Sequence, residues 1–148
     1  MLSVLAFLAH LVWESVQCPL LFEHLSYDST WRGMLRATLG DIVLTWAVYG
    51  AVALVSRRWR WPRRPWGARQ LLTLGITAVA LAVAIELRGL HTGRWRYVEG
   101  ATVLPWIGVA FAPILQLLVL TPLLVAAAEC VAGHAGAAPS RRAPRAAR

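Results

Sequence analysis

The chain contains no lysine, and all 15 of its basic residues are arginine. It has only two cysteines, Cys18 and Cys130, and no Cys-x-x-Cys pair. This cysteine content argues against a disulfide framework and gives no support to a thiol oxidase. No arginine precedes the first apolar run, so the basic region of a secretory signal peptide is missing. We therefore expect residues 1–22 to be retained as a membrane span.

Acidic residues are also scarce, with seven against 15 basic ones and a net charge of +8. A basic protein can bind nucleic acid, but here six arginines lie in residues 57–69 and four in residues 141–148, beside apolar runs. Arginine in that position sets membrane topology and contacts anionic headgroups. No nucleic-acid recognition motif accompanies the charge. The expected partners are therefore membrane lipids and not nucleic acid.

Apolar residues are abundant, at 58% of the chain, whereas soluble domains contain about 45–50%. They gather in four segments, residues 2–22, 35–56, 70–88 and 102–128. Each segment is near or above the ~20 residues that a helix needs to cross a bilayer. The sequence thus predicts an all-α fold, a four-helix transmembrane bundle in residues 1–132. The Ala-, Gly-, Pro- and Arg-rich residues 133–148 are expected to form a disordered basic tail.

The arginine-rich regions also predict the orientation. In a four-span chain, residues 57–69, residues 141–148 and the N-terminus all lie on one side of the membrane. The positive-inside rule makes that side cytoplasmic. We expect a multi-pass protein of a bacterial inner (plasma) membrane, with its N-terminus and C-terminus in the cytoplasm.

Glu14 stands in the middle of the first apolar segment, where a carboxylate costs several kcal/mol unless it is neutral, paired or hydrated. Residues three or four apart share a helix face, so Glu14 lies on a polar stripe with His10, Gln17 and Cys18. At ~1.5 Å per residue, Glu14, Asp41 and Glu86 all fall in the outer half of the membrane. Lipid cannot solvate these groups, so the bundle turns them inward. We expect one acidic site that opens to the extracytoplasmic side.

The candidate ligand-binding residues are this cluster and its polar neighbours: Glu14, Asp41, Glu86, Gln17, Gln116, Arg94 and Tyr97. Glu14 and Asp41 form the core, Glu86 is a gate or third ligand, and Arg94 is an electrostatic lid. Three carboxylates in close quarters need a proton, a metal, an arginine partner or a cationic ligand. His10, Glu14 and Cys18 are the metal candidates. No motif identifies a cofactor or a catalytic residue.

Several short motifs follow one another along the chain. They are W-E-x-x-Q-x-P-L from Trp13 to Leu20, Gly-Asp at residues 40–41, E-x-x-x-x-x-x-G-R-W-x-Y from Glu86 to Tyr97, and P-x-x-Q from Pro113 to Gln116. Together they resemble a set of small uncharacterised bacterial four-span integral membrane proteins, which implies a fold and no activity. A four-span chain with a glutamate, Glu14, in its first span also resembles the small multidrug resistance exporters. That second resemblance implies exchange of protons for cationic drugs.

Three functions remain open at the level of the sequence. The leading one is binding or transport of an ion or small cationic ligand at the acidic intramembrane site. The second is a membrane enzyme acting on a lipid or lipid-linked substrate, with a carboxyl as general base and Arg94 holding a phosphate. The third is a structural subunit of a membrane complex, whose carboxyls join helices of a homo-oligomer or of another membrane protein.

Overall fold

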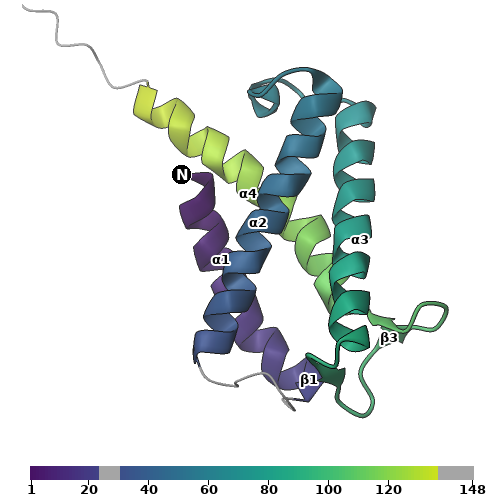
Figure 1. The fold of residues 1–148 in the computed structure, drawn as a ribbon. Coiled ribbons are helices and arrows are strands. Elements are labelled where there is room, and N and C mark those ends of the chain that lie inside the picture. Colours follow the sequence, from purple (N-terminus) through teal and green to yellow (C-terminus); the bar gives the residue numbers. More distant parts are fainter. Residues whose placement is uncertain (24–30, 137–148) are drawn as a thin grey trace, which may run out of the picture.

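The computed structural model describes residues 1–23 and 31–136 of the chain (Figure 1). Its α-helices in these ranges are α1 (Leu2–Leu21), α2 (Trp31–Ser56), α3 (Ala68–His91) and α4 (Phe111–Gly136). All four are long and apolar enough to cross a membrane. The all-α prediction is therefore confirmed, and the fold is consistent with a multi-pass membrane protein.

The fourth helix begins and ends later than the predicted span 102–128. It starts at Phe111, and the residues before it form a hairpin of β3 (Val103–Leu104) and β4 (Val109–Ala110). Pro105 disfavours a helical conformation at the residue before it. Gly108 has a φ of 65°, a backbone conformation that favours glycine. Pro105 and Gly108 therefore favour a turn in a segment that hydropathy alone predicts to be helical.

At its other end, α4 continues to Gly136. The alanines of residues 126–136 favour helix, so residues 133–136 are helical rather than the start of a disordered tail. The rest of the predicted tail, residues 137–148, lies outside the described residues.

α1 turns its polar side chains toward the bundle interior and exposes apolar side chains on its outer face. Its outer stripe, with 54–71% of each side chain exposed, consists of Val4, Leu8, Val12, Val16 and Leu20. Its inner face carries His10, Glu14 and Gln17, which are at most 8% exposed. Such an arrangement suits hydrocarbon surroundings, because lipid solvates the apolar stripe and the bundle must satisfy the polar one.

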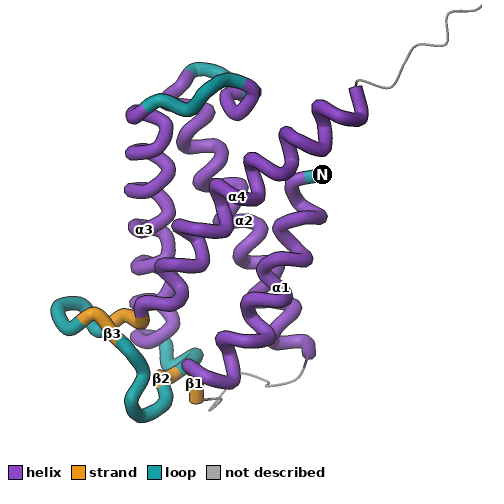
Figure 2. Tube along the Cα trace, turned by 180° about the vertical axis from the view of Figure 1, so that it is seen from behind, coloured by secondary structure: helices purple, strands orange, loops and turns teal. Residues whose placement is uncertain are grey.

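The two ends of the bundle carry different structures (Figures 1 and 2). At the strand end, β1 (Phe22–Glu23) pairs antiparallel with β2 (Arg96–Tyr97), which ties the end of α1 to the loop after α3. At the opposite end, which we term the arginine end, residues 57–67 connect α2 to α3 and include the short 3-10 helix η1 (Trp61–Arg63). α4 crosses the bundle obliquely between the two ends.

Candidate functional site

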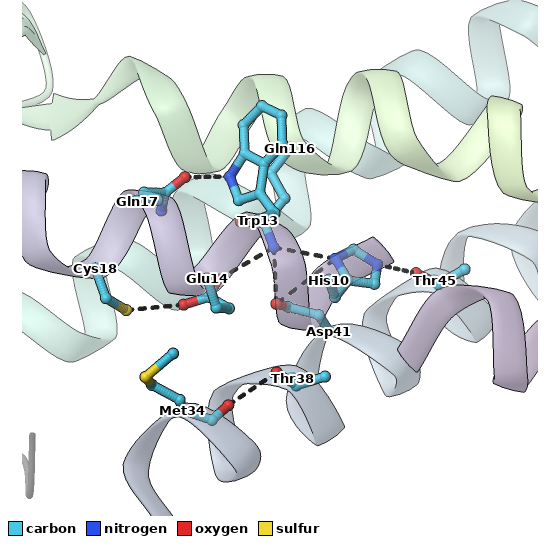
Figure 3. Close-up of polar contacts among 10 residues, drawn as sticks. All are labelled: His10, Trp13, Glu14, Gln17, Cys18, Met34, Thr38, Asp41, Thr45 and Gln116. Carbon is cyan, nitrogen blue, oxygen red and sulfur yellow. Dashed lines mark hydrogen bonds and ion pairs between the residues drawn. The ribbon is translucent and has the colours of Figure 1, made fainter. Parts of the chain in front are cut away.

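Gln116 of α4 joins polar side chains of α1 and α2 in the bundle interior (Figure 3). Its Nε2 atom lies 2.8 Å from Asp41 Oδ2, 3.1 Å from Glu14 Oε1 and 3.0 Å from His10 Nδ1. An amide nitrogen carries two hydrogens, so it cannot donate to three acceptors at once. At least one of the three groups therefore needs a proton or a further donor. We call these four residues the Gln116 network.

The network extends along α1 in both directions. Toward the arginine end, His10 Nε2 lies 3.0 Å from Thr45 Oγ1 of α2. Toward the strand end, Cys18 Sγ donates to Glu14 Oε2 at 3.0 Å. His10 and Thr45 are completely buried, whereas 17% of the Asp41 side chain is exposed. Asp41 is therefore the accessible edge of the network, and His10 lies behind it.

The network brings two carboxyl groups against one neutral amide. His10 lies within ion-pair range of one of them, with its Nδ1 3.7 Å from Asp41 Oδ2. Keeping two carboxylates ionised in a buried, poorly hydrated position costs several kcal/mol per charge unless they are well paired. A proton or a bound cation removes that cost.

Glu86 of α3 is held by the loop that follows its helix. Its Oε2 accepts hydrogen bonds from the Tyr97 hydroxyl at 2.5 Å and from Trp95 Nε1 at 3.3 Å. The Tyr97 oxygen also accepts the Ala110 backbone N–H at 3.0 Å. Burial above all, opposed by the Ala110 N–H and reinforced by Glu86, raises the pKa of Tyr97 above its ordinary value. Tyr97 thus stays protonated and remains a donor to Glu86.

The carboxyl groups of Glu14, Asp41 and Glu86 line one cavity of about 380 Å³ near the strand end. Its walls include every residue predicted to bind a ligand except Tyr97, namely Glu14, Gln17, Asp41, Glu86, Arg94 and Gln116. Tyr97 holds Glu86 by its hydroxyl instead. Ligand sites occupy ~300–1,000 Å³, so the cavity suits a small molecule. That these residues bind a ligand stays a prediction.

The cavity also contains residues that the sequence did not assign to a site. Arg36, which falls inside the predicted span 35–56, lies on its wall near the start of α2. The available signal was the spacing of Arg36 and Gly40, which is one helical turn. Trp95 lies on the same wall, where the Arg94 guanidinium stands 5.5 Å from the centre of its ring.

The metal candidates are not arranged as ligands. Cys18 is hydrogen-bonded to Glu14, and the two ring nitrogens of His10 contact Thr45 and Gln116. Within residues 1–23 and 31–136, no group of three or more His, Cys, Asp or Glu side chains is placed to hold a metal ion. The geometry therefore gives no support to a metal at His10, Glu14 and Cys18.

Comparison with protein families, curated proteins and solved structures finds no match for this chain. Its resemblance to small four-span bacterial membrane proteins stays an expectation from the sequence. Function therefore has to be inferred from the geometry of the site.

Proposed function

We propose that this protein binds a small organic cation in the 380 Å³ cavity and exchanges it for a proton held by Glu14 and Asp41. The observation that carries this proposal is the contact of Glu14, Asp41 and His10 with a single amide nitrogen of Gln116. Two hydrogens cannot serve three partners, so at least one partner, a carboxyl group or His10 Nδ1, carries a proton of its own or has a further donor; we propose that the carboxyl pair holds this proton. A cation that reaches Asp41 takes over the role of that proton.

The walls of the cavity favour an organic cation over a bare inorganic ion. Phe22, Leu44 and Leu117 give it a largely apolar surface, which cannot replace the hydration shell of a small ion. The carboxyls of Glu14 and Asp41 supply the charge that the ligand must match. Binding then exchanges one positive charge for another, and the buried site never holds two unpaired carboxylates.

We further propose that the strand end faces the extracytoplasmic side of a bacterial inner membrane. The six arginines of residues 57–69 lie at the opposite end of the bundle, where the positive-inside rule expects cytoplasm. The cavity would then take its ligand from outside the cell or from the outer leaflet.

Equilibrium binding of radiolabelled tetramethylammonium to the purified protein in lipid nanodiscs tests the proposal. Asp41→Asn and Glu14→Gln keep the shape of each side chain and remove its charge. Because a hydrogen bond or contact to a charged group contributes about 1.5–3 kcal/mol, each change is expected to weaken binding about tenfold or more. Glu129→Gln is the matched control, since Glu129 pairs with Arg63 at the bundle surface, and it should bind like wild type.

Two results would contradict the proposal. One is wild-type binding no greater than that of empty nanodiscs. The other is binding that Asp41→Asn and Glu14→Gln leave unchanged.

A further inference from the structure

A second cavity, of about 990 Å³, lies between α1 and α4 beside the acidic one. We call it the α1–α4 groove. Its α1 wall contains Leu8, Val12, Val16 and Leu20, which belong to the exposed outer stripe of that helix. Phe111 and Leu115 of α4 lie on its other wall. The groove is thus apolar and open on the face where a spanning helix meets hydrocarbon.

Gln17 is the residue that lines both the groove and the acidic cavity. Trp13 lines the groove and donates its indole N–H to Gln17 Oε1 (Figure 3). Gln17 and Trp13 therefore place a hydrogen-bonded polar pair where an apolar groove meets a charged cavity. The hydrogen bond between them offsets the cost of burying their polar atoms in an apolar lining. Gln17 also lines the acidic cavity, so the polar pair lies where a charged headgroup would join its hydrocarbon chain.

We propose that the ligand of the acidic cavity is a single-chain cationic amphiphile, whose ammonium group lies by Glu14 and Asp41 and whose hydrocarbon chain lies in the α1–α4 groove. This inference rests on the proposed function and specifies its ligand class. The charge of the headgroup complements the two carboxyls, and the chain complements the apolar walls. The two cavities share Gln17 as a lining residue, so in this proposal the ligand passes that side chain. Because the groove opens sideways, such a molecule enters from the bilayer.

Displacement of radiolabelled tetramethylammonium by alkyltrimethylammonium ions in nanodiscs tests this proposal. One alkyl chain is lengthened from ethyl to dodecyl while the headgroup stays the same. Val12→Trp and Val16→Trp add bulk inside the groove at exposed positions, where the bundle tolerates it. Val4→Trp is the matched control, because Val4 is equally exposed on α1 and lines neither cavity. The alkyltrimethylammonium ions partition into the nanodisc lipid equally for all variants, so this partition does not affect the comparison between them.

Affinity should rise as the alkyl chain lengthens from ethyl to dodecyl, because a longer chain buries more apolar area. This rise is expected to be about tenfold larger in wild type and Val4→Trp than in Val12→Trp and Val16→Trp. All four proteins should bind tetramethylammonium itself equally, which also shows that each variant is folded. An equal chain-length gain in all four overturns the proposal. If the gain in affinity with chain length is equal in all four proteins and the groove variants also change their oligomeric mass, the proposal is overturned and a second copy of the chain occupies the groove.

The two proposals fail in different ways. If wild type does not bind tetramethylammonium, the proposed function fails and the amphiphile inference fails with it. If tetramethylammonium binds and depends on Asp41 while chain length has no groove-dependent effect, the inference alone fails.

Discussion

At the arginine end of the bundle, aromatic rings pack against one another around Tyr49, whereas near the strand end carboxyl groups line a cavity. Tyr49 packs against three tryptophan rings at centroid distances of 5.2–5.6 Å, and its hydroxyl donates to the Trp59 carbonyl at 2.5 Å. The ion pair of Arg63 with Glu129 stays on the surface, with 53% of the Arg63 side chain exposed. At the strand end, Glu14, Asp41 and Glu86 instead line the interior.

This contrast argues against a general packing defect of a small bundle as the origin of the acidic cavity. The same bundle gathers large rings around Tyr49 near one end and places three carboxyl groups around a cavity near the other. Protein interiors are otherwise close-packed, and a void forfeits favourable contacts. A cavity whose walls carry three carboxyls supports the ligand site that we propose.

The largest expected effect comes from removing the amide on which the polar site depends. Gln116→Leu leaves Glu14, Asp41 and His10 without their shared donor, and each unsatisfied buried group costs about 1–3 kcal/mol. We expect the free energy of unfolding in mixed micelles to fall by about 3 kcal/mol or more.

A glutamine at the arginine end provides the control. Gln70 accepts the exposed Gly67 N–H at 3.1 Å. Gln70→Ala should cost about 0.5–1 kcal/mol, as for a helix cap. Equal losses of unfolding free energy in Gln116→Leu and Gln70→Ala would show that the Gln116 network stabilises the protein no more than a helix cap does.

The next largest effect concerns the wall formed by Trp95. A Cβ at Gly89 would lie 1.9 Å from Cζ2 of the Trp95 ring, so Gly89→Ala must displace a ring that donates to Glu86. Overpacking of this kind costs about 1–3 kcal/mol, and tetramethylammonium binding should weaken as the wall moves. Gly50→Ala in α2 is the matched control, because a Cβ there meets no atom within 4 Å. It should be neutral or slightly stabilising. Unchanged tryptophan fluorescence in Gly89→Ala would refute the displacement.

The smallest effect is expected at the two tyrosine hydroxyls. Tyr97→Phe removes one of the two hydrogen bonds to Glu86 and the acceptor of the Ala110 N–H. Tyr49→Phe removes a hydrogen bond to the Trp59 carbonyl. Each should cost about 1 kcal/mol of unfolding free energy. Only Tyr97→Phe should alter tetramethylammonium binding, since Glu86 lines the cavity. Altered binding in Tyr49→Phe as well would mean that the two ends are coupled.

Tyr97 also predicts a dependence of stability on pH. Its pKa in the folded protein is raised above the ordinary value of 10.0, chiefly by burial. The folded state then holds the phenolic proton more tightly than the unfolded state, so this contribution is complete below pH 10 and is lost as the pH rises above it. Melting temperatures measured across this alkaline range should fall less steeply for Tyr97→Phe than for wild type. Identical slopes would exclude the predicted shift.

Much of the site was predictable because helical spacing and lipid solvation are simple constraints. The inward face of His10, Glu14 and Gln17 follows from their spacing of three and four residues, since lipid cannot solvate them. The common depth of Glu14, Asp41 and Glu86 follows from the helical rise. Both constraints act within single helices, which is why they can be read from the sequence.

The central position of Gln116 was not predictable in the same way. Its contacts depend on the rotation and oblique crossing of α4, which no periodicity within that helix determines. The late start of α4 was missed because hydropathy does not separate a short apolar hairpin from a helix. Pro105 and Gly108 carried the signal. The start of α2 at Trp31, four residues before the predicted start, was missed as well.

The central claim is that the Gln116 network holds a proton that a cation replaces. Infrared difference spectroscopy of the protein in nanodiscs, with and without tetramethylammonium, tests it most directly through the C=O band of protonated carboxyl groups. We predict that this band is present in the unliganded protein, decreases when the cation binds, and shows no such decrease in Asp41→Asn combined with Glu14→Gln. A wild-type protein that binds tetramethylammonium without any change in this band would contradict the claim.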